Sequence, residues 1–138
     1  MDLGHWLLSE DIAINESTFG FIYEITNTVT NKKYIGKKQC QSKIKRQPLK
    51  GKKNKRILIK ESDWKTYTSS SQELNDDIIK LGKDKFIFKI IKVCQSKWEL
   101  AYFEIKEQIE RNVLLRKDYY NGIINVRIGR PPKNFLNN

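Results

Sequence analysis

The sequence is poor in residues that bind metals through sulfur or nitrogen. It contains two cysteines and one histidine, and Cys40 and Cys94 lie far apart without a CxxC neighbour. This spacing excludes a zinc site of standard type and gives no ground for inferring a disulfide, so we expect two reduced thiols.

Long apolar runs are also missing. No stretch approaches the roughly 18 apolar residues that are needed to span a bilayer. The start, with Asp2 and a short apolar stretch at residues 6–8, does not resemble a signal peptide. At 138 residues, 38% hydrophobic and 31% charged, the chain fits one domain without an internal repeat. We therefore expect a cytoplasmic protein with no membrane partner.

Acidic residues are absent from residues 37–60, a stretch that contains eleven Lys or Arg residues. The formal net charge is +11, so the rest of the chain is close to neutral. A block that repels itself in this way gains stability against a polyanion, which is typical of phosphate-backbone binding. A solvated basic loop is the alternative, and a membrane surface is disfavoured because the block lacks an amphipathic apolar face. The candidate nucleic-acid contacts are Lys37, Lys43, Lys45, Lys50, Lys52, Lys53, Lys55, Arg56 and Lys60.

Two short runs rich in aromatic and β-branched residues predict a β-hairpin. Residues 20–25 and 33–36 are the strands, and residues 26–32 supply turn formers. The hairpin carries Tyr23 and Tyr34. A cross-strand aromatic pair stabilises a hairpin without any chemistry, so a purely structural role stays open for both phenols.

Two capping boxes predict helices. Ser70 with Glu73 opens a short helix that ends at Gly82, and Ser96 opens the longest helix, which runs to about Asn112. Residues 85–93 between them are expected to form a strand in the middle of a sheet, and residues 57–60 a second short strand. The long helix carries an apolar stripe that we expect to be buried, formed by Trp98, Tyr102, Ile105 and Ile109.

These elements add up to an α+β fold with a small three-stranded antiparallel sheet flanked by helices. We expect residues 1–18 to form an N-terminal arm or short helix, residues 19–128 the main domain with a basic loop at 37–60, and residues 129–138 a tail that leaves the domain. The tail contains Gly129-Arg130-Pro131, which resembles the core of an AT-hook and makes Arg130 a further candidate DNA contact. A disordered tail is the alternative.

The amino-acid sequence of the predicted hairpin resembles a known signature. Phe21-Ile22-Tyr23 and Tyr34-Ile35-Gly36 are similar to the motif of the GIY-YIG nuclease superfamily, with Phe21 in place of the first glycine. The later order of a basic stretch, the block 62–70 and a helix carrying Glu104 resembles the phage Seg-type branch of homing endonucleases. The resemblance covers roughly residues 19–128.

This resemblance implies a metal-dependent endonuclease that hydrolyses phosphodiester bonds of double-stranded DNA. It also implies phage origin, a homing role and a location in the host cytosol. Mg²⁺ is the expected ion, with Mn²⁺ as a substitute, and no other cofactor is expected. A catalytically silent DNA-binding module and a restriction-type nuclease are the alternative functions, and the sequence does not decide between a monomer and a homodimer.

Glu104 is the candidate metal ligand. Glu107 precedes Arg111 by four residues and Glu110 follows Lys106 by four, so both acids have helix-surface partners. Glu104 has no such partner and lies on the shoulder of the apolar stripe. A solvent-facing glutamate is the alternative, but the single metal-binding Glu of the family falls at Glu104.

The family resemblance gives the phenols their roles. One of Tyr23 and Tyr34 holds or deprotonates the attacking water, the other positions it, and Gly36 lets backbone approach the site closely. A phenol with an ordinary pKa near ~10 is a poor base at neutral pH, so nearby cations such as Lys37 would have to lower its pKa. Lys38 is the alternative base.

Two further residues that the family resemblance implies, an arginine that clamps the phosphate and an asparagine that orients the site, match this sequence only approximately. Arg46 is the arginine nearest to the expected phosphate clamp, and Arg56 is its rival. No histidine stands at the usual place of a general base. Asn121, seventeen residues beyond Glu104, is favoured over Asn125 as the residue that orients the site, although Asn121 and the glycine after it also suit a tight turn.

Overall fold

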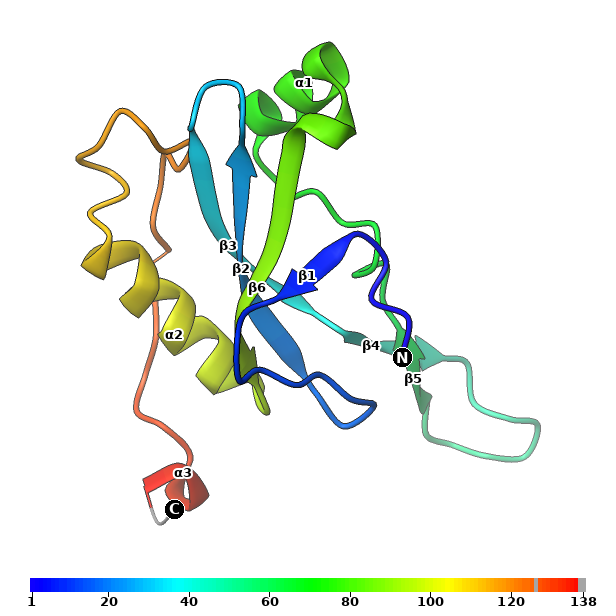
Figure 1. Cartoon of the computed structure of the whole chain (residues 1–138). Coiled ribbons are helices and arrows are strands. Elements are labelled where there is room, and N and C mark those ends of the chain that lie inside the picture. The colour runs from blue at the N-terminus through cyan, green and yellow to red at the C-terminus, as the bar shows by residue number, and fades with distance from the viewer. Residues whose placement is uncertain (126, 137–138) are drawn as a thin grey trace.

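The computed structural model describes residues 1–125 and 127–136, without the side chains of residues 43–45 and 136. Figure 1 shows a twisted sheet with α2 along one side and α1 near one end. The elements are β1 (Trp6–Leu8), β2 (Gly20–Asn27), β3 (Lys33–Gln39), β4 (Gln41–Arg46), β5 (Arg56–Glu61), α1 (Gln72–Leu81), the 3₁₀ turn η1 (Lys83–Lys85), β6 (Phe86–Cys94), α2 (Lys97–Glu110) and α3 (Lys133–Leu136).

The main sheet has four strands in the order β1-β6-β2-β3. β1 runs parallel to β6, and the other neighbours are antiparallel. The predicted α+β class is compatible with this sheet, whereas the prediction of three antiparallel strands was wrong by one strand. Residues 1–18, expected as an arm or short helix, supply β1. A strand of three residues is too short to show alternation in the sequence, and Trp6 holds it in place by burying its ring and donating Nε1–H to the carbonyl of Trp64.

The hairpin predicted from the two tyrosine runs is confirmed as β2 and β3. The Oδ1 atom of Asn27 accepts from the two backbone N–H groups at positions 29 and 30, and Asn31 adopts a positive φ of 61°. Both features suit a polar turn. The register places Tyr23 opposite Gly36.

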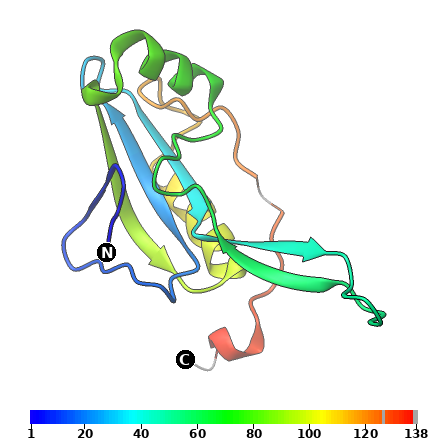
Figure 2. The ribbon, with the colours of Figure 1, turned by 90° about the vertical axis from the view of Figure 1, so that its right-hand side faces the viewer.

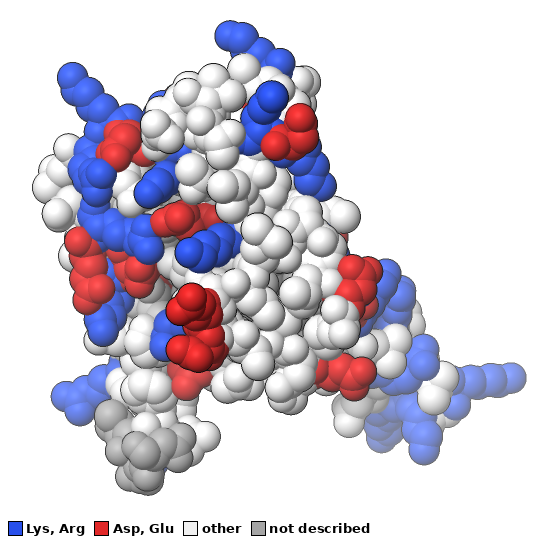
Figure 3. Space-filling view, viewed as in Figure 1, with Lys and Arg blue, Asp and Glu red and all other residues white. Residues whose placement is uncertain are grey.

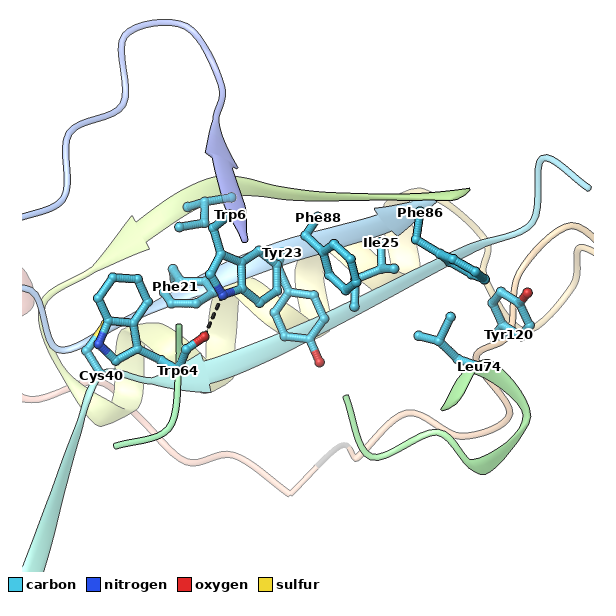
Figure 4. Packing of buried hydrophobic residues seen from close by; sticks show 11 residues of the cluster. Trp6, Phe21, Tyr23, Ile25, Cys40, Trp64, Leu74, Phe86, Phe88 and Tyr120 are labelled. Carbon is cyan, nitrogen blue, oxygen red and sulfur yellow. Dashed lines mark hydrogen bonds between the residues drawn. The ribbon is translucent and has the colours of Figure 1, made fainter. Parts of the chain in front are cut away.

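Alternating residues of the sheet belong to two separate clusters. Phe21 and Tyr23 pack with β1, Trp64 and α1 on one face, as Figure 4 shows. Ile22 and Ile35 pack with Leu100 of α2 on the other face. The two candidate phenols therefore belong to the first face, and the helix that carries Glu104 covers the second.

Both predicted helices are confirmed. α1 is capped by Ser71, one residue later than expected, and ends at Gly82 with a φ of 98°. α2 begins after Ser96, whose hydroxyl accepts from the backbone N–H of Glu99 at 3.1 Å. The strand predicted at 85–93 is β6, shifted by one residue.

The apolar stripe predicted for α2 does not face the sheet. Leu100 and Gln108 are the residues of α2 that are buried, while Tyr102 and Ile109 are 38% and 56% exposed. The expectation of a buried stripe was therefore wrong. The periodicity was genuine, but it marks the outer side of the helix.

The C-terminal segment lies against this outer side rather than leaving the domain. Trp98 donates Nε1–H to the carbonyl of Gly129 at 3.0 Å, and its ring lies 4.8 Å from that of Phe135. Ile128 and Ile109 line one shallow hollow there. The apolar stripe is thus partly covered by the chain's own end, which accounts for its composition.

The basic stretch 37–60, expected as a loop, forms the end of β3 and a two-stranded ribbon. β4 and β5 pair antiparallel from Gln41 opposite Glu61 to Arg46 opposite Arg56. The strand expected at residues 57–60 lies within β5. Figure 2 shows the ribbon projecting away from the main sheet. Within the described ranges, no helix is both long and apolar enough to cross a bilayer.

Candidate active site

Tyr23 and Tyr34 meet above the glycine of the second strand. Their rings are stacked with centroids 6.1 Å apart and an interplanar angle of 29°. A Cβ atom built on Gly36 would stand 2.5 Å from the Tyr23 hydroxyl and 2.8 Å from the Tyr34 ring. Figure 4 shows the Tyr23 hydroxyl pointing away from the other labelled side chains, and Tyr23 is 1% exposed. The missing side chain of Gly36 therefore makes the room that the two phenols occupy.

β3 is an edge strand, and its outward-facing backbone groups explain how α2 reaches the phenols. Lys33 bonds to the chain that follows α2, and Ile35 bonds through both its N–H and its carbonyl to Asn121. The next outward residue, Lys37, lies beside the Glu104 carboxylate, and its charge and its backbone N–H both oppose the rise that burial causes in the pKa of Glu104. The Glu104 side chain thus lies at the β3 edge of the sheet, although its helix α2 packs on the face opposite the phenols.

The Glu104 carboxyl is held in a desolvated position. Its side chain is 15% exposed, and the Lys37 ammonium lies 3.9 Å away. Burial raises the pKa of Glu104, while the Lys37 charge and the backbone hydrogen bond from Lys37 oppose the rise. A buried acid with a raised pKa beside an exposed edge is typical of a functional carboxylate.

Electrostatics link this carboxyl to the phenols. Burial raises the pKa of Tyr23 well above its ordinary value, and the charges of Tyr34, Tyr67 and Glu104 raise it further. The pKa of Tyr34 is raised by burial and by Glu104, against a hydrogen bond from Ser70. The charge of Glu104 therefore raises the pKa of both phenols, and the catalytic roles of the three residues stay predictions. The lowered phenol pKa that a tyrosine base would require is not found.

Lys38 lies on the same face as the phenols and is held by two groups. Its Nζ atom is 2.6 Å from the Asp63 carboxylate and 4.0 Å from the centre of the Tyr67 ring. The hydrogen bond from Lys38 lowers the pKa of Asp63. Tyr67 in turn packs edge-on to Tyr23 at 6.3 Å. The ammonium of Lys38 thus sits beside the phenol cluster with a fixed counter-ion.

Asn121 fixes the strand that carries the glycine. Its Oδ1 accepts from Ile35 N–H at 3.1 Å, and its Nδ2 donates to the Ile35 carbonyl at 2.8 Å. Gln108 of α2 donates to the same carbonyl at 3.0 Å. The side chain of Asn121 thus replaces a neighbouring strand at the edge of β3. Its role as the residue that orients the site stays a prediction.

The structure does not bring Arg46 to this edge. Arg46 ends β4, five residues past Gln41, which is about 17 Å along a strand at ~3.3 Å per residue. Arg56 lies opposite it at the same outer end. Lys37, whose ammonium lies 3.9 Å from the Glu104 carboxylate, lines a hollow of about 180 Å³ together with Lys38 and Lys97.

The candidate DNA contacts other than Lys37 and Arg130 lie in the ribbon or in its connecting turn, and Figure 3 shows Lys and Arg side chains gathered there. The side chains of Lys43 and Lys45 fall outside the described part of the structure. Arg130 follows the glycine that contacts α2 and is exposed. No observation tests these contacts, which stay predictions.

Comparison with known families agrees with this geometry. The family model described as "Putative endonuclease segE, GIY-YIG domain" matches residues 6–124. The chain belongs to this family. The searches of curated proteins and of solved structures found no match. The matched range begins at β1, so the family domain includes a strand within residues 1–18, which we expected to form an N-terminal arm or short helix.

Membership of the SegE-type GIY-YIG family makes the chain a nuclease domain with DNA as its substrate, and the resemblance noted in the sequence is confirmed. GIY-YIG nucleases generally depend on a divalent metal. The donor set at the β3 edge fits such an ion. Among the described residues no group of three His, Cys, Asp or Glu side chains could hold a metal. A single carboxylate suffices for Mg²⁺, because this ion keeps several waters and takes the rest of its ligands from substrate phosphate.

Sequence reasoning did not assign three residues that the structure brings to this edge. Asp63 and Tyr67 belong to the block noted as similar to the Seg-type branch, but neither was given a role. Lys97 lies outside the basic stretch altogether. The signal for Asp63 was its place in that block, whereas nothing in the sequence points to Lys97.

Proposed function

We propose that the chain is a Mg²⁺-dependent endonuclease that hydrolyses one phosphodiester bond at the exposed edge of β3. The observation that supports this most is the convergence of Glu104 with Tyr23 and Tyr34 from opposite faces of the sheet. Separate elements position the three groups, since α2 holds the carboxyl and the hairpin holds the phenols.

Glu104 holds the ion in this proposal. The ion would neutralise charge on the phosphoryl oxygens and on the leaving 3′ oxygen. The charge and the backbone N–H of Lys37 both favour the ionised Glu104 carboxylate, and burial around this carboxyl favours binding of a cation. The neighbouring Lys37 ammonium, at 3.9 Å, is too far to satisfy the carboxylate by itself.

The two phenols act in the protonated form on this account. Burial raises the pKa of both, so each hydroxyl can donate a hydrogen bond at neutral pH. Tyr23, which is only 1% exposed and whose hydroxyl lies over Gly36, would orient the attacking water. Tyr34 fixes the Tyr23 ring by stacking, and the absence of a side chain at Gly36 leaves the space that both rings need.

Positive charge on the phosphate comes from lysines rather than from Arg46. Lys37, Lys38 and Lys97 line one hollow, and of these Lys37 lies 3.9 Å from the Glu104 carboxylate. The part of this lining that the structure describes contains no acidic residue. Lysine acts there as a point charge, which suits a phosphate that an ion also holds.

A plasmid assay tests the proposal. Supercoiled DNA is incubated with the wild type and with Glu104→Gln, with and without Mg²⁺, and open-circle formation is timed. We expect nicking that requires the ion, and a loss of roughly 100-fold or more in the variant. Glu110→Gln is the matched control, because Glu110 is on the same helix, is exposed, and pairs only loosely with Lys106 at 3.9 Å.

Two outcomes would overturn the proposal. Binding of DNA without nicking by the wild type would favour a catalytically silent DNA-binding module of the same fold. Equal rates for Glu104→Gln and Glu110→Gln would remove Glu104 from the site. Unfolding curves of both variants separate a loss of activity from a loss of structure.

Other parts of the biology stay predictions. The homing role, phage origin and host-cytosol location rest on the sequence resemblance, and a restriction-type nuclease is the alternative. One site per chain makes a monomer a nicking enzyme and a homodimer a double-strand cutter. Sedimentation combined with the plasmid forms produced decides this point.

A further inference from the structure

The β4–β5 ribbon is the strongest feature of the molecule that the nuclease site does not use. Its two strands of six residues extend about 17 Å at ~3.3 Å per residue. Figure 2 shows it standing clear of the main sheet. A free two-stranded ribbon is marginally stable by itself, so this element is expected to have a partner.

The charge of the ribbon defines that partner as a polyanion. Arg46 and Arg56 lie directly opposite each other, an arrangement that destabilises a bare sheet. The turn that joins the strands carries four more cations and no acid, at Lys50, Lys52, Lys53 and Lys55. Phosphates on either side of the ribbon would relieve the repulsion between these cations.

Apolar side chains show that the ribbon does more than contact phosphates. Ile57, Leu58 and Ile59 are 61%, 42% and 66% exposed, and they lie between Arg56 and Lys60 along β5. A purely electrostatic contact needs no exposed isoleucines. The methyl groups of thymine, which lie in the major groove, are apolar partners that occur between two rows of phosphates.

The size of the ribbon selects the groove. A two-stranded ribbon fits the major groove, which is about 12 Å wide, whereas the minor groove is only about 6 Å wide. We propose that the β4–β5 ribbon inserts into the major groove of duplex DNA and reads base edges there. This inference rests on the proposed nuclease function and adds the element that selects the target.

The base of the ribbon is fixed to the catalytic edge. Only Cys40 separates β3 from β4, and its backbone N–H donates to the carbonyl of Phe19 at 2.8 Å. Ser62 donates its backbone N–H to the Cys40 carbonyl at 2.9 Å and its hydroxyl to the Gln39 carbonyl at 2.5 Å. The bases that the ribbon contacts therefore lie at a constant offset from the bond that is cut.

Binding to groove-blocked duplexes tests the inference. Fluorescence anisotropy gives the affinity for three duplexes of one sequence: unmodified, with C5-octadiynyl pyrimidines that fill the major groove, and with netropsin bound in the minor groove. We expect the major-groove block to weaken binding roughly tenfold or more. Netropsin should change the affinity less than twofold.

Variants tie this effect to the ribbon. Arg46→Gln with Arg56→Gln should weaken binding to unmodified DNA and remove the difference between the duplexes. The control pair Lys89→Gln with Lys106→Gln removes the same charge from exposed positions on β6 and α2 and should keep that difference. A netropsin effect larger than the octadiynyl effect, or equal affinities for all three duplexes, would overturn the inference.

Plasmid nicking by the wild type, measured in parallel, distinguishes the two proposals. Nicking that persists while the groove block has no effect would refute the ribbon's role alone. Absence of both binding and nicking would refute the nuclease function and the ribbon inference together.

Discussion

Replacing Gly36 by alanine is the sharpest test of how the two phenols are held. Gly36 does not have a positive φ, so alanine is compatible with its backbone, and the effect is purely steric. The added methyl would stand 2.5 Å from the Tyr23 hydroxyl oxygen and 2.6 Å from its Cζ atom. To reach ordinary contact, the Tyr23 hydroxyl would have to retreat by about 1 Å, and a displacement of that size costs about 100-fold in rate.

Stability should fall less than activity. Overpacking costs about 1–3 kcal/mol, and removing a glycine from a strand returns about 0.5–1 kcal/mol of it. Urea unfolding and plasmid nicking measure the two effects on the same preparation. The control is Gly129→Ala, because a Cβ there meets nothing within 4 Å. We expect that control to change the free energy of unfolding by less than about 0.5 kcal/mol.

A Gly36→Ala protein with wild-type nicking would refute the reasoning. It would mean either that Tyr23 does not touch the reacting groups or that its position over Gly36 has no importance. If the free energy of unfolding of the Gly36→Ala variant fell by more than about 3 kcal/mol, the hairpin would be unable to accommodate the added methyl group. The rate measurement would then be repeated with Tyr23→Phe, which removes the hydroxyl and keeps the ring.

Three further outcomes follow from the structure. Asn121→Ala should lower the free energy of unfolding in urea by about 1–3 kcal/mol, because it leaves the buried N–H of Ile35 unpaired. Replacing the exposed Asn125 by alanine should leave the free energy of unfolding almost unchanged, and equal effects of the two substitutions would contradict the role of Asn121 at the edge of β3. Burial lowers the pKa of His5 to about 4, so the unfolded chain binds a proton that the folded chain does not between pH 6.5 and pH 4; stability should fall as the pH falls through this window, and less steeply in His5→Gln. Because its raised pKa keeps the Tyr23 hydroxyl protonated, Tyr23→Phe should lower the nicking rate equally at every pH from 7 to 9; a tenfold rise per pH unit that is seen in the wild type and lost in Tyr23→Phe would indicate a phenolate base and contradict the account.

The elements found from the sequence are those with a complete local signal. The hairpin has β-formers on both sides of a polar turn, and α1 and α2 have capping residues at their first turns. β1 has no such signal, because three residues show no alternation and its place depends on Trp6 burying itself beside Trp64. The α2 stripe shows a second limit: periodicity reveals that a helix face is apolar, but not whether the sheet or the C-terminal segment covers it.

In the candidate site, too, some residues can be predicted from local sequence, whereas other contacts depend on the fold. Glu104 could be chosen because its helix neighbours leave it without a cation, and the tyrosines because of their motif. The contact between Lys38 and Asp63 joins residues twenty-five positions apart and depends on where the ribbon returns to the sheet. Arg46 was chosen by counting along the chain, and the count fails because residues 41–46 form a strand that leads away from the sheet.

The central claim is that Glu104 and the two phenols act on one phosphate at the edge of β3. A crystal structure of the protein with a duplex and Mn²⁺ tests it most directly, because the anomalous signal locates the ion independently of the protein. The account predicts an ion within coordination distance of the Glu104 carboxylate and a phosphate between that ion and the Tyr23 hydroxyl. An ion bound elsewhere, or DNA lying on a face from which Glu104 cannot be reached, would contradict it.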